Sequence, residues 1–290
     1  MRKEPVSSLA TRAPRSIAVL GAAGLLGRRV VLELGAAARP LARASCDVTD
    51  RESVLRATEG ASLVVNCAAW TDVDGAESHV DDAFRVNALG AENAAIAAKA
   101  HGASLIHVST GFVFDGAQER PYDEFDLPHP QSAYARSKWA GEELVRSALD
   151  RVFVVRLQSL YGLGSKNFAS SLRRRILARQ PLTLDAERPA QPTWAGAAAR
   201  QIVRLAETEH FGTYHAACAG ETTWAAFARA IAAHVGVEPY WTESQPANAG
   251  AARPRNQLLA RRMLGLRGLD VMAEWSSALA EYLAEEDERR

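Results

Sequence analysis

The sequence is poor in the residues that would mark a disulfide scaffold, a metal cluster or a highly charged binding surface. Its 290 residues include only three cysteines, Cys46, Cys67 and Cys218, which lie far apart without metal-ligand spacing. Such cysteines suit a reducing compartment, and we interpret them as small buried hydrophobic residues. Thirty-four basic residues balance thirty-four acidic ones, so the net charge gives no reason to expect nucleic acid or an anionic membrane as a partner.

Long apolar runs are also missing. No stretch of about 18 apolar residues occurs, and the basic and polar residues 1–14 contain no apolar segment of the kind found in export signals. We therefore expect a cytoplasmic protein that does not span a membrane. With 48% hydrophobic and 23% charged residues, the chain can bury one large core, or a main core and a satellite.

What the sequence does contain is an alternation of short apolar runs and helical segments. This alternation is typical of an α/β fold in which helices cover both faces of a parallel sheet. We predict a Rossmann-type doubly wound parallel sheet with a smaller C-terminal lobe. The predicted strands are residues 16–20, 63–65, 105–108 and 152–155, and the predicted helices are residues 25–34, 81–101 and 134–149.

After about residue 163 the alternation weakens, which predicts a second, smaller region. An Arg-rich helix (170–179), a helix opened by residues 191–194 and a helix over 222–235 are expected there, and Gly212-Thr213-Tyr214-His215 is expected to return one strand to the main sheet. The proline-rich stretch 116–132 predicts a loop over the strand ends. The charged tail 285–290 reads as a solvated end. We divide the chain into a main domain, 15–163 with a returning segment at about 192–218, and a smaller substrate-binding lobe, 164–191 and 219–290.

A glycine-rich turn, Gly21-Ala22-Ala23-Gly24-Leu25-Leu26-Gly27, follows the first predicted strand and opens the first predicted helix. Glycines let a phosphate approach the backbone, and the N–H groups of the helix start can hold a pyrophosphate. A tight turn without a ligand is the alternative, but the strand and helix context favours a dinucleotide site in the main domain. Its spacing is Gly-x-x-Gly-x-x-Gly.

The residues after the second predicted strand favour NADPH, with NADH as the alternative. An acidic residue there would bind the ribose 2′-OH of NAD, whereas an arginine accommodates the additional phosphate of NADP. The chain has Arg39-Pro40-Leu41-Ala42-Arg43, and no carboxylate appears before Asp47. Arg43 is the candidate phosphate ligand, with Arg39 or Arg28 as additional candidates. Asp47-Val48 would lie along the adenine, and the small residues of Asn66-Cys67-Ala68-Ala69 would let a cofactor ribose pack against backbone.

Tyr134 and Lys138 lie one helical turn apart, so a phenol and a cation are neighbours on one face of a helix. A free tyrosine has a pKa near 10, and a nearby cation favours loss of its proton. Thr110, after the 105–108 strand, can donate its hydroxyl to a substrate oxygen, with Ser109 as the less favoured candidate. These residue types suit proton delivery during hydride transfer to a carbonyl. The alternatives are a surface helix pair and a capping threonine.

At this point the chain resembles the extended short-chain dehydrogenase/reductase superfamily and, within it, the dTDP-4-dehydrorhamnose reductase family. The resemblance covers nearly the whole chain. It rests on the glycine turn, Asp47-Val48-Thr49-Asp50, the segment 65–77, Asn87, the segment 107–116, Tyr134-x-x-x-Lys138-x-x-Gly141-Glu142, Asn167-Phe168, Gln191-Pro192-Thr193, Gly212-Thr213-Tyr214-His215 and Arg253-Pro254-x-Asn256.

The resemblance implies NADPH-dependent reduction of a nucleotide-linked 4-keto-6-deoxysugar, with Thr110, Tyr134 and Lys138 as the catalytic triad. It also implies a C-terminal lobe that binds the nucleotide-sugar. No cluster of acidic residues with metal spacing is apparent, and the sequence leaves a homodimer open. The implied or candidate substrate contacts are Trp70, Val73, Thr110, Gly111, Phe112, Ser159, Arg253 and, with the core as its alternative, Tyr161.

Two departures from the family pattern affect the sugar pocket. Members of the family usually have Asp-Tyr after the threonine, where this chain has Gly111-Phe112, and a tryptophan in the segment where this chain has Ser159. The missing Asp-Glu pair argues against a sugar 4,6-dehydratase. Two alternatives to a reductase remain: an epimerase that retains NAD through its cycle, and a non-catalytic NADP-binding regulatory subunit. The intact Tyr134 and Lys138 weigh against the regulatory subunit.

Overall fold

The computed structural model describes residues 16–164, 167–238, 241–243 and 250–289, and its main sheet has six parallel strands. The strand order is β10-β5-β4-β3-β1-β2. The predicted return of residues 212–215 is confirmed, since this segment pairs in parallel with β5. The strands are β1 (Ile17–Leu20), β2 (Ala38–Leu41), β3 (Leu63–Asn66), β4 (Ser104–Thr110), β5 (Val152–Leu157) and β10 (Gly212–His215).

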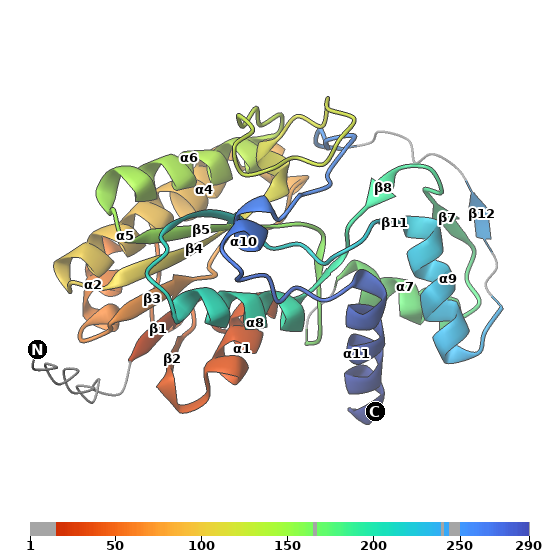
Figure 1. The fold of residues 1–290 in the computed structure, drawn as a ribbon, viewed down its shortest axis with the longest axis horizontal. Coiled ribbons are helices and arrows are strands. Elements are labelled where there is room, and N and C mark those ends of the chain that lie inside the picture. Colours follow the sequence, from red (N-terminus) through yellow and green to blue (C-terminus); the bar gives the residue numbers. More distant parts are fainter. Residues whose placement is uncertain (1–15, 165–166, 239–240, 244–249, 290) are drawn as a thin grey trace, which may run out of the picture.

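Helices cover both faces of this sheet, as Figure 1 shows. Every residue of β1, β3 and β5 is buried, which is why these strands read as continuous apolar runs. The predicted Rossmann-type doubly wound fold is therefore confirmed. One face carries α1 (Leu25–Leu34) and α8 (Ala195–Ala206), and the other carries α2 (Arg51–Thr58), α4 (Val80–Phe84), α5 (Gly90–Ala100) and α6 (Ala133–Ala148).

The order of the strands creates a crevice between β1 and β3. From β1 the chain first adds β2 on one side and then crosses to add β3 on the other. Ligands of open α/β sheets bind at such a switch point, beyond the carboxyl ends of the strands. The glycine turn follows β1 and residues 67–70 follow β3, so the fold brings the two predicted cofactor segments to the same crevice.

The predicted helix over 81–101 is interrupted. A π-helical turn (Arg85–Leu89) separates α4 from α5. The turn places the buried Asn87 amide between Trp70 and Ser137. Its Nδ2 donates to the Trp70 carbonyl at 3.1 Å and to Ser137 Oγ at 2.9 Å. Oδ1 accepts from Trp70 N at 2.8 Å. A regular helix would lose this orientation, and such turns are frequent at functional sites.

The remaining strands are two or three residues long and pair in three small sheets, too short for the sequence pattern to reveal them. They are β6 (Leu160–Tyr161) with β9 (Thr193–Trp194), β7 (Leu182–Leu184) with β12 (Trp241–Glu243), and β8 (Pro189–Ala190) with β11 (Thr222–Thr223). The other helices and turns are α3 (Gly75–Ser78), α7 (Phe168–Leu177), α9 (Trp224–Val235), α10 (Arg262–Leu266), α11 (Trp275–Glu288), and 3₁₀ turns at Gly35–Ala37 and Gly111–Val113. A smaller lobe at the right of Figure 1 includes β7, β8, β11, β12, α7 and α9.

Residues 285–288 do not form a free tail, contrary to the sequence-based expectation for 285–290, of which Arg290 lies outside the described residues. They belong to α11, whose acidic side chains face arginines on two other helices. Glu285 accepts two hydrogen bonds of 2.8 Å from the buried Arg29 of α1, and Asp287 pairs with Arg173 of α7. The charge run was misread because its partners lie 256 and 114 residues away in sequence.

The contact between Glu285 and Arg29 supports a stability prediction. We expect Glu285→Ala to lower the free energy of unfolding by about 2 kcal/mol, because it leaves the Arg29 guanidinium buried without its carboxylate. Urea unfolding followed by tryptophan fluorescence measures the change. Glu288→Ala, three residues on at an exposed position of the same helix, is the control and should change stability by less than about 0.5 kcal/mol. Equal effects of the two variants would contradict the prediction.

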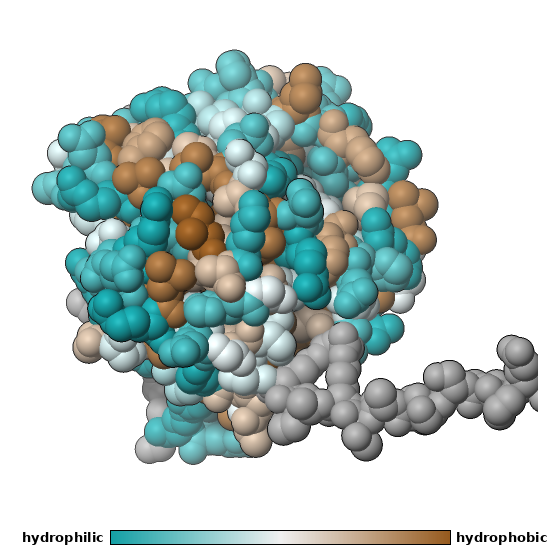
Figure 2. Space-filling model, turned by 90° about the vertical axis from the view of Figure 1, so that its left-hand side faces the viewer, coloured by the Kyte–Doolittle hydropathy of each residue, from teal (hydrophilic) through white to brown (hydrophobic). Residues whose placement is uncertain are grey.

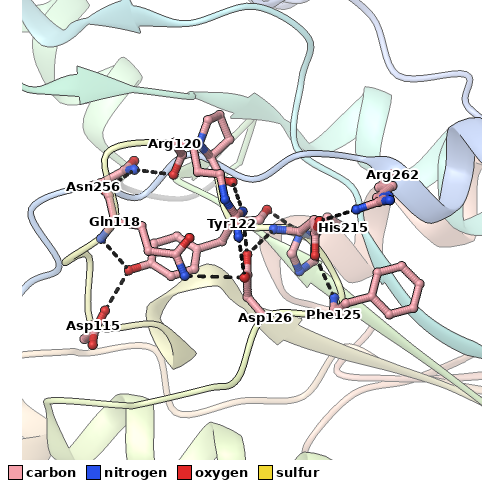
Figure 3. Close-up of polar contacts among 11 residues, drawn as sticks. Asp115, Gln118, Arg120, Tyr122, Phe125, Asp126, His215, Asn256 and Arg262 are labelled. Atoms are coloured by element: carbon pink, nitrogen blue, oxygen red, sulfur yellow. Dashed lines mark hydrogen bonds and ion pairs between the residues drawn. The ribbon is translucent and has the colours of Figure 1, made fainter.

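The predicted loop over the strand ends is fixed by hydrogen bonds to the C-terminal segment (Figure 3). Tyr122 N donates to the Leu258 carbonyl at 2.9 Å, and Ala260 N donates to the Tyr122 carbonyl at 2.7 Å. Asn256 Nδ2 donates to the Gln118 carbonyl at 2.9 Å. Segments more than a hundred residues apart in sequence are thus joined above the sheet.

Among the described residues, no helix is both long and apolar enough to cross a bilayer. Figure 2 shows apolar and polar residues interspersed on the face turned toward the viewer.

Candidate active site

A cavity of about 790 Å³ lies at the carboxyl ends of the main strands and reaches the smaller lobe. Most of the predicted site residues line it, although they come from segments spread over more than a hundred residues. Those residues are Gly21, Gly24, Leu25, Leu26, Arg43, Asp47, Val48, Ala68, Ala69, Trp70, Val73, Thr110, Phe112, Tyr134, Lys138 and Ser159.

Four predicted residues, Gly27, Asn66, Gly111 and Arg253, do not line this cavity. The Asn66 side chain lies beneath it, where Oδ1 accepts from Ala68 N at 3.1 Å and so shapes the turn after β3. A Cβ on Gly111 would lie 2.7 Å from Gln158 Oε1, so this residue allows close packing behind the pocket. Arg253 forms an ion pair with Asp74 at 2.8 Å.

The three glycines of the turn have different structural roles. Gly21 has φ of 71°, and a Cβ there would lie 2.6 Å from Ala68 N, so the β1 and β3 ends approach each other closely. A Cβ on Gly27 would lie 2.3 Å from the Gly21 carbonyl oxygen, which makes this glycine a packing residue of α1. Gly24 precedes the helix and offers no side chain to cap its first turn. The N–H groups at the start of α1 therefore lie along the cavity wall.

Arg43 and Asp47 line the cavity together, near the end of β2. Hydrogen bonds from the backbone and hydroxyl of Thr49 lower the pKa of Asp47, and Arg43 contributes in the same direction. Asp47 is thus a carboxylate already engaged by Thr49, at 2.9 and 2.8 Å. Arg39 lies outside the cavity lining and donates to the Glu59 carbonyl at 2.9 Å.

Tyr134, Lys138 and Thr110 meet at one end of the cavity. Ser132 caps α6 by accepting from Ala135 N, so the helix begins just before Tyr134 and directs it toward the end of β4. Lys138 Nζ donates to the Val108 carbonyl at 2.7 Å. Phe112 N donates to Thr110 Oγ1 at 3.2 Å, which leaves the threonine hydroxyl proton available.

The pKa values of this group differ from the expectation for Tyr134. Burial raises the pKa of Tyr134 to about 12, and the hydrogen bond with Thr110 only partly opposes this shift. Lys138 is directed to the Val108 carbonyl and is not the dominant influence on the phenol. Burial also lowers the pKa of Lys138 to about 8. At neutral pH Tyr134 therefore holds its proton and Lys138 is charged.

The part of the cavity next to Tyr134 is largely apolar. The Phe112 ring meets the Tyr134 ring edge-on, with centroids 6.1 Å apart. Ser159, which has φ of 45°, lines the same cavity. Tyr161 does not line it: this side chain is buried against Phe227 and Tyr282, so the core alternative is correct for it.

Sequence reasoning missed several wall residues. Val86 belongs to the π-helical turn, whose local geometry gave no sequence signal. Asn167 and Phe168 reach the cavity at the start of α7, and their occurrence in the family pattern was the available signal. Leu157 and Leu160 complete the wall from the end of β5 and from β6.

Comparison with known proteins agrees with this geometry. The family model described as the RmlD substrate binding domain matches residues 15–288. The chain is 35% identical to a dTDP-4-keto-6-deoxy-D-glucose reductase of Streptomyces niveus, over 91% of this chain and 94% of that protein. It is also 35% identical to a dTDP-4-dehydrorhamnose reductase of Mycobacterium tuberculosis, over 95% of this chain and 94% of that protein.

Solved structures show the same likeness. A dTDP-4-dehydrorhamnose reductase of Bacillus anthracis in complex with NADP has a TM-score of 0.90 and 31% identity, covering 93% of this chain and 99% of that one. A Clostridium acetobutylicum dTDP-4-dehydrorhamnose reductase also has a TM-score of 0.90, with 32% identity over 94% of this chain and 99% of that one. By the family model, the sequence identities and the fold, the chain belongs to the dTDP-4-dehydrorhamnose reductase family of the extended short-chain dehydrogenases/reductases.

Proposed function

We propose that this chain is an NADPH-dependent reductase of a nucleotide-linked 4-keto-6-deoxysugar. The observation that carries the proposal is one cavity whose wall runs from the glycine turn after β1 to Tyr134, Lys138 and Thr110. The names of the relatives support the substrate class, and the NADP complex of one solved relative supports the cofactor.

The residues present fit a dinucleotide. The start of α1 and Gly24 would hold the pyrophosphate, and Arg43 offers a cation for the 2′-phosphate. Ala68 and Ala69 would leave room for a ribose, and Lys138 would bond the ribose near the nicotinamide. Arg253 is proposed to leave its ion pair with Asp74 and to bind the substrate from the smaller lobe. Residues 15–163 with 192–218 would form the dinucleotide-binding part, and 164–191 with 219–290 the substrate-binding part.

The reaction needs a proton at the sugar oxygen when a hydride reaches carbon C4. NADPH, when bound, supplies the hydride. Tyr134, which is protonated at neutral pH, would transfer its proton to the oxygen, and the Thr110 hydroxyl would hold that oxygen by a hydrogen bond. Lys138 would orient the ribose and, as a cation, favour the phenolate left behind.

A substrate screen tests this function directly. The purified protein is mixed with dTDP- and UDP-linked 4-keto-6-deoxysugars and with NADPH or NADH, and loss of the reduced nicotinamide absorbance is followed. We expect turnover with at least one ketosugar and faster turnover with NADPH. Because Gly111-Phe112 and Ser159 depart from the family pattern, the screen should include sugars that differ at C2, C3 and C5. Tightly retained NAD and no net oxidation of NADPH would instead indicate the epimerase.

Arg43 provides a test of cofactor preference. We expect Arg43→Ala to raise the KM for NADPH by roughly tenfold to a hundredfold while leaving the KM for NADH nearly unchanged, because a charge-assisted contact to the 2′-phosphate is lost. Arg39→Ala is the matched control, since Arg39 bonds the Glu59 carbonyl outside the cavity. Equal changes for the two cofactors would remove Arg43 from the phosphate site.

A further inference from the structure

A completely buried carboxylate, Glu142, lies one helical turn after Lys138. Its Oε1 accepts from Ser109 Oγ at 2.5 Å and from Arg156 Nε at 3.0 Å. Its Oε2 accepts from Arg156 Nη2 at 2.8 Å and from Arg146 Nη2 at 2.7 Å. A buried charge is costly unless it is paired and hydrogen-bonded, and here both carboxylate oxygens are fully engaged.

The position of Ser109 links this carboxylate to the reaction site. Ser109 lies in β4 between Val108, whose carbonyl accepts from Lys138 Nζ, and Thr110, whose hydroxyl meets Tyr134. The Ser109–Glu142 hydrogen bond therefore joins α6 to β4 at the level where both elements present their reacting groups. A shift of α6 along β4 would have to break this contact.

Further side chains fix the position of Arg156, which pairs with the Glu142 carboxylate. The Arg156 guanidinium lies 5.1 Å from the Phe114 ring centroid and is 3.4 Å from His215 Nε2. His215 Nδ1 lies 3.1 Å from the Tyr122 carbonyl and 3.0 Å from the Ala260 carbonyl, so it carries the proton and Nε2 accepts from Arg156. Figure 3 shows His215 beside the Tyr122 loop. The network thus runs from the reaction site to the loop above the sheet.

We propose that Glu142 is a positioning residue for the reductase reaction: through Ser109 it holds the end of β4 and helix α6 in the relative placement that Thr110, Tyr134 and Lys138 require. The inference rests on the function proposed above. It adds a residue that touches neither substrate nor cofactor, since Glu142 does not line the cavity. The negative charge of Glu142 also acts electrostatically on Lys138.

The titratable groups that face Lys138 are Tyr134 and Glu142 from its own helix, Cys67 after β3 and His107 on β4. Burial lowers the pKa of Lys138, and Glu142 is the larger of the two opposing influences, ahead of Cys67. Burial and Lys138 lower the pKa of His107, which is therefore neutral. Removing the Glu142 charge should lower the pKa of Lys138 further, so that its cation is lost at a lower pH.

Three variants separate geometry from charge. We expect Glu142→Gln to lower kcat by roughly tenfold to a hundredfold with little change in the KM for the sugar, because the reacting groups are displaced. The high-pH limb of its kcat profile should move to lower pH. Ser109→Ala removes the link but keeps the charge, so it should lower kcat without moving that limb. Glu143→Gln, at the exposed neighbouring position, should change neither.

The outcomes distinguish this inference from the proposed function. Unchanged kcat and an unchanged pH limb in a folded Glu142→Gln protein would overturn it while leaving the reductase intact. If Glu142→Gln does not fold, an unchanged kcat in Ser109→Ala has the same meaning. If the wild-type protein reduces no ketosugar, the proposed reductase function is wrong. The pH dependence of NADPH binding then tests the role of Glu142. If the high-pH limb of that binding profile does not move in Glu142→Gln, the proposed role of Glu142 is rejected.

Discussion

Replacing Tyr134 by phenylalanine should lower turnover by roughly 10²- to 10⁴-fold, the range for losing a general acid. Burial keeps the phenol protonated at neutral pH, and its hydrogen bond with Thr110 places it beside the hydroxyl that would hold the substrate oxygen. The dissociation constant for NADPH should change by less than about threefold, because the glycine turn and Arg43 are untouched. Single-turnover oxidation of NADPH measures the chemical step, and fluorescence titration measures cofactor binding.

Tyr161→Phe is the matched control for this experiment. It makes the same chemical change at a buried tyrosine outside the cavity, whose hydroxyl has no hydrogen-bond partner among the residues that the structure describes. We expect unchanged turnover and equal or slightly greater stability, since an unsatisfied buried hydroxyl is removed. Full activity in Tyr134→Phe would reject the proton-donor assignment, whatever the control shows.

Replacing Arg156 by leucine should lower the free energy of unfolding by about 3 kcal/mol, the lower end of the range for breaking a buried ion pair. Glu142 would remain completely buried, and Arg146, at 2.7 Å, would be its remaining ion-pair partner among the described residues. Urea unfolding at neutral pH measures the loss. The double variant Glu142→Met/Arg156→Met should recover much of it, because apolar residues of similar volume can replace a buried pair.

The same pair predicts how stability depends on pH. Burial alone would raise the pKa of Glu142, but the Arg156 guanidinium outweighs this and lowers it to about 2. A carboxyl with a lowered pKa in the folded state stabilises the fold above its unfolded value, near 4.5, and loses this contribution as pH falls toward 2. The stability difference between wild type and Arg156→Leu should therefore be greatest at neutral pH and shrink below about pH 4.5. A constant difference from pH 7 to 3 would contradict this origin.

Sequence reasoning succeeded where a local pattern dictates local structure. The buried strands, the glycine turn and the helix that carries Tyr134 and Lys138 follow from apolar periodicity and from glycine at positions that admit no Cβ. Most predicted wall residues follow as well, because parallel strands end at one edge of the sheet. Side chains whose position depends on distant partners could not be placed in this way.

Three cases show this limit. Asn87 lies in a π-helical turn, and its amide is bonded to the Trp70 backbone 17 residues earlier. The acidic run at the end of the chain looked like a solvated tail because Arg29 is its partner. The pKa of Tyr134 could not be judged from Lys138 alone, since burial raises it and the opposing influence is the hydrogen bond with Thr110. Each depends on tertiary packing, which periodicity does not report.

The late position of β10 in the sequence has a consequence for biosynthesis. The edge strand of the main sheet emerges from the ribosome only after β6 to β9, α7 and α8 have been made, and Glu285 joins Arg29 at the very end. A fragment that stops near residue 163 would expose the open edge of β5 and leave α1 without α8, a state prone to aggregate. The main sheet should therefore be completed only late in synthesis, after α8 and β10 have left the ribosome.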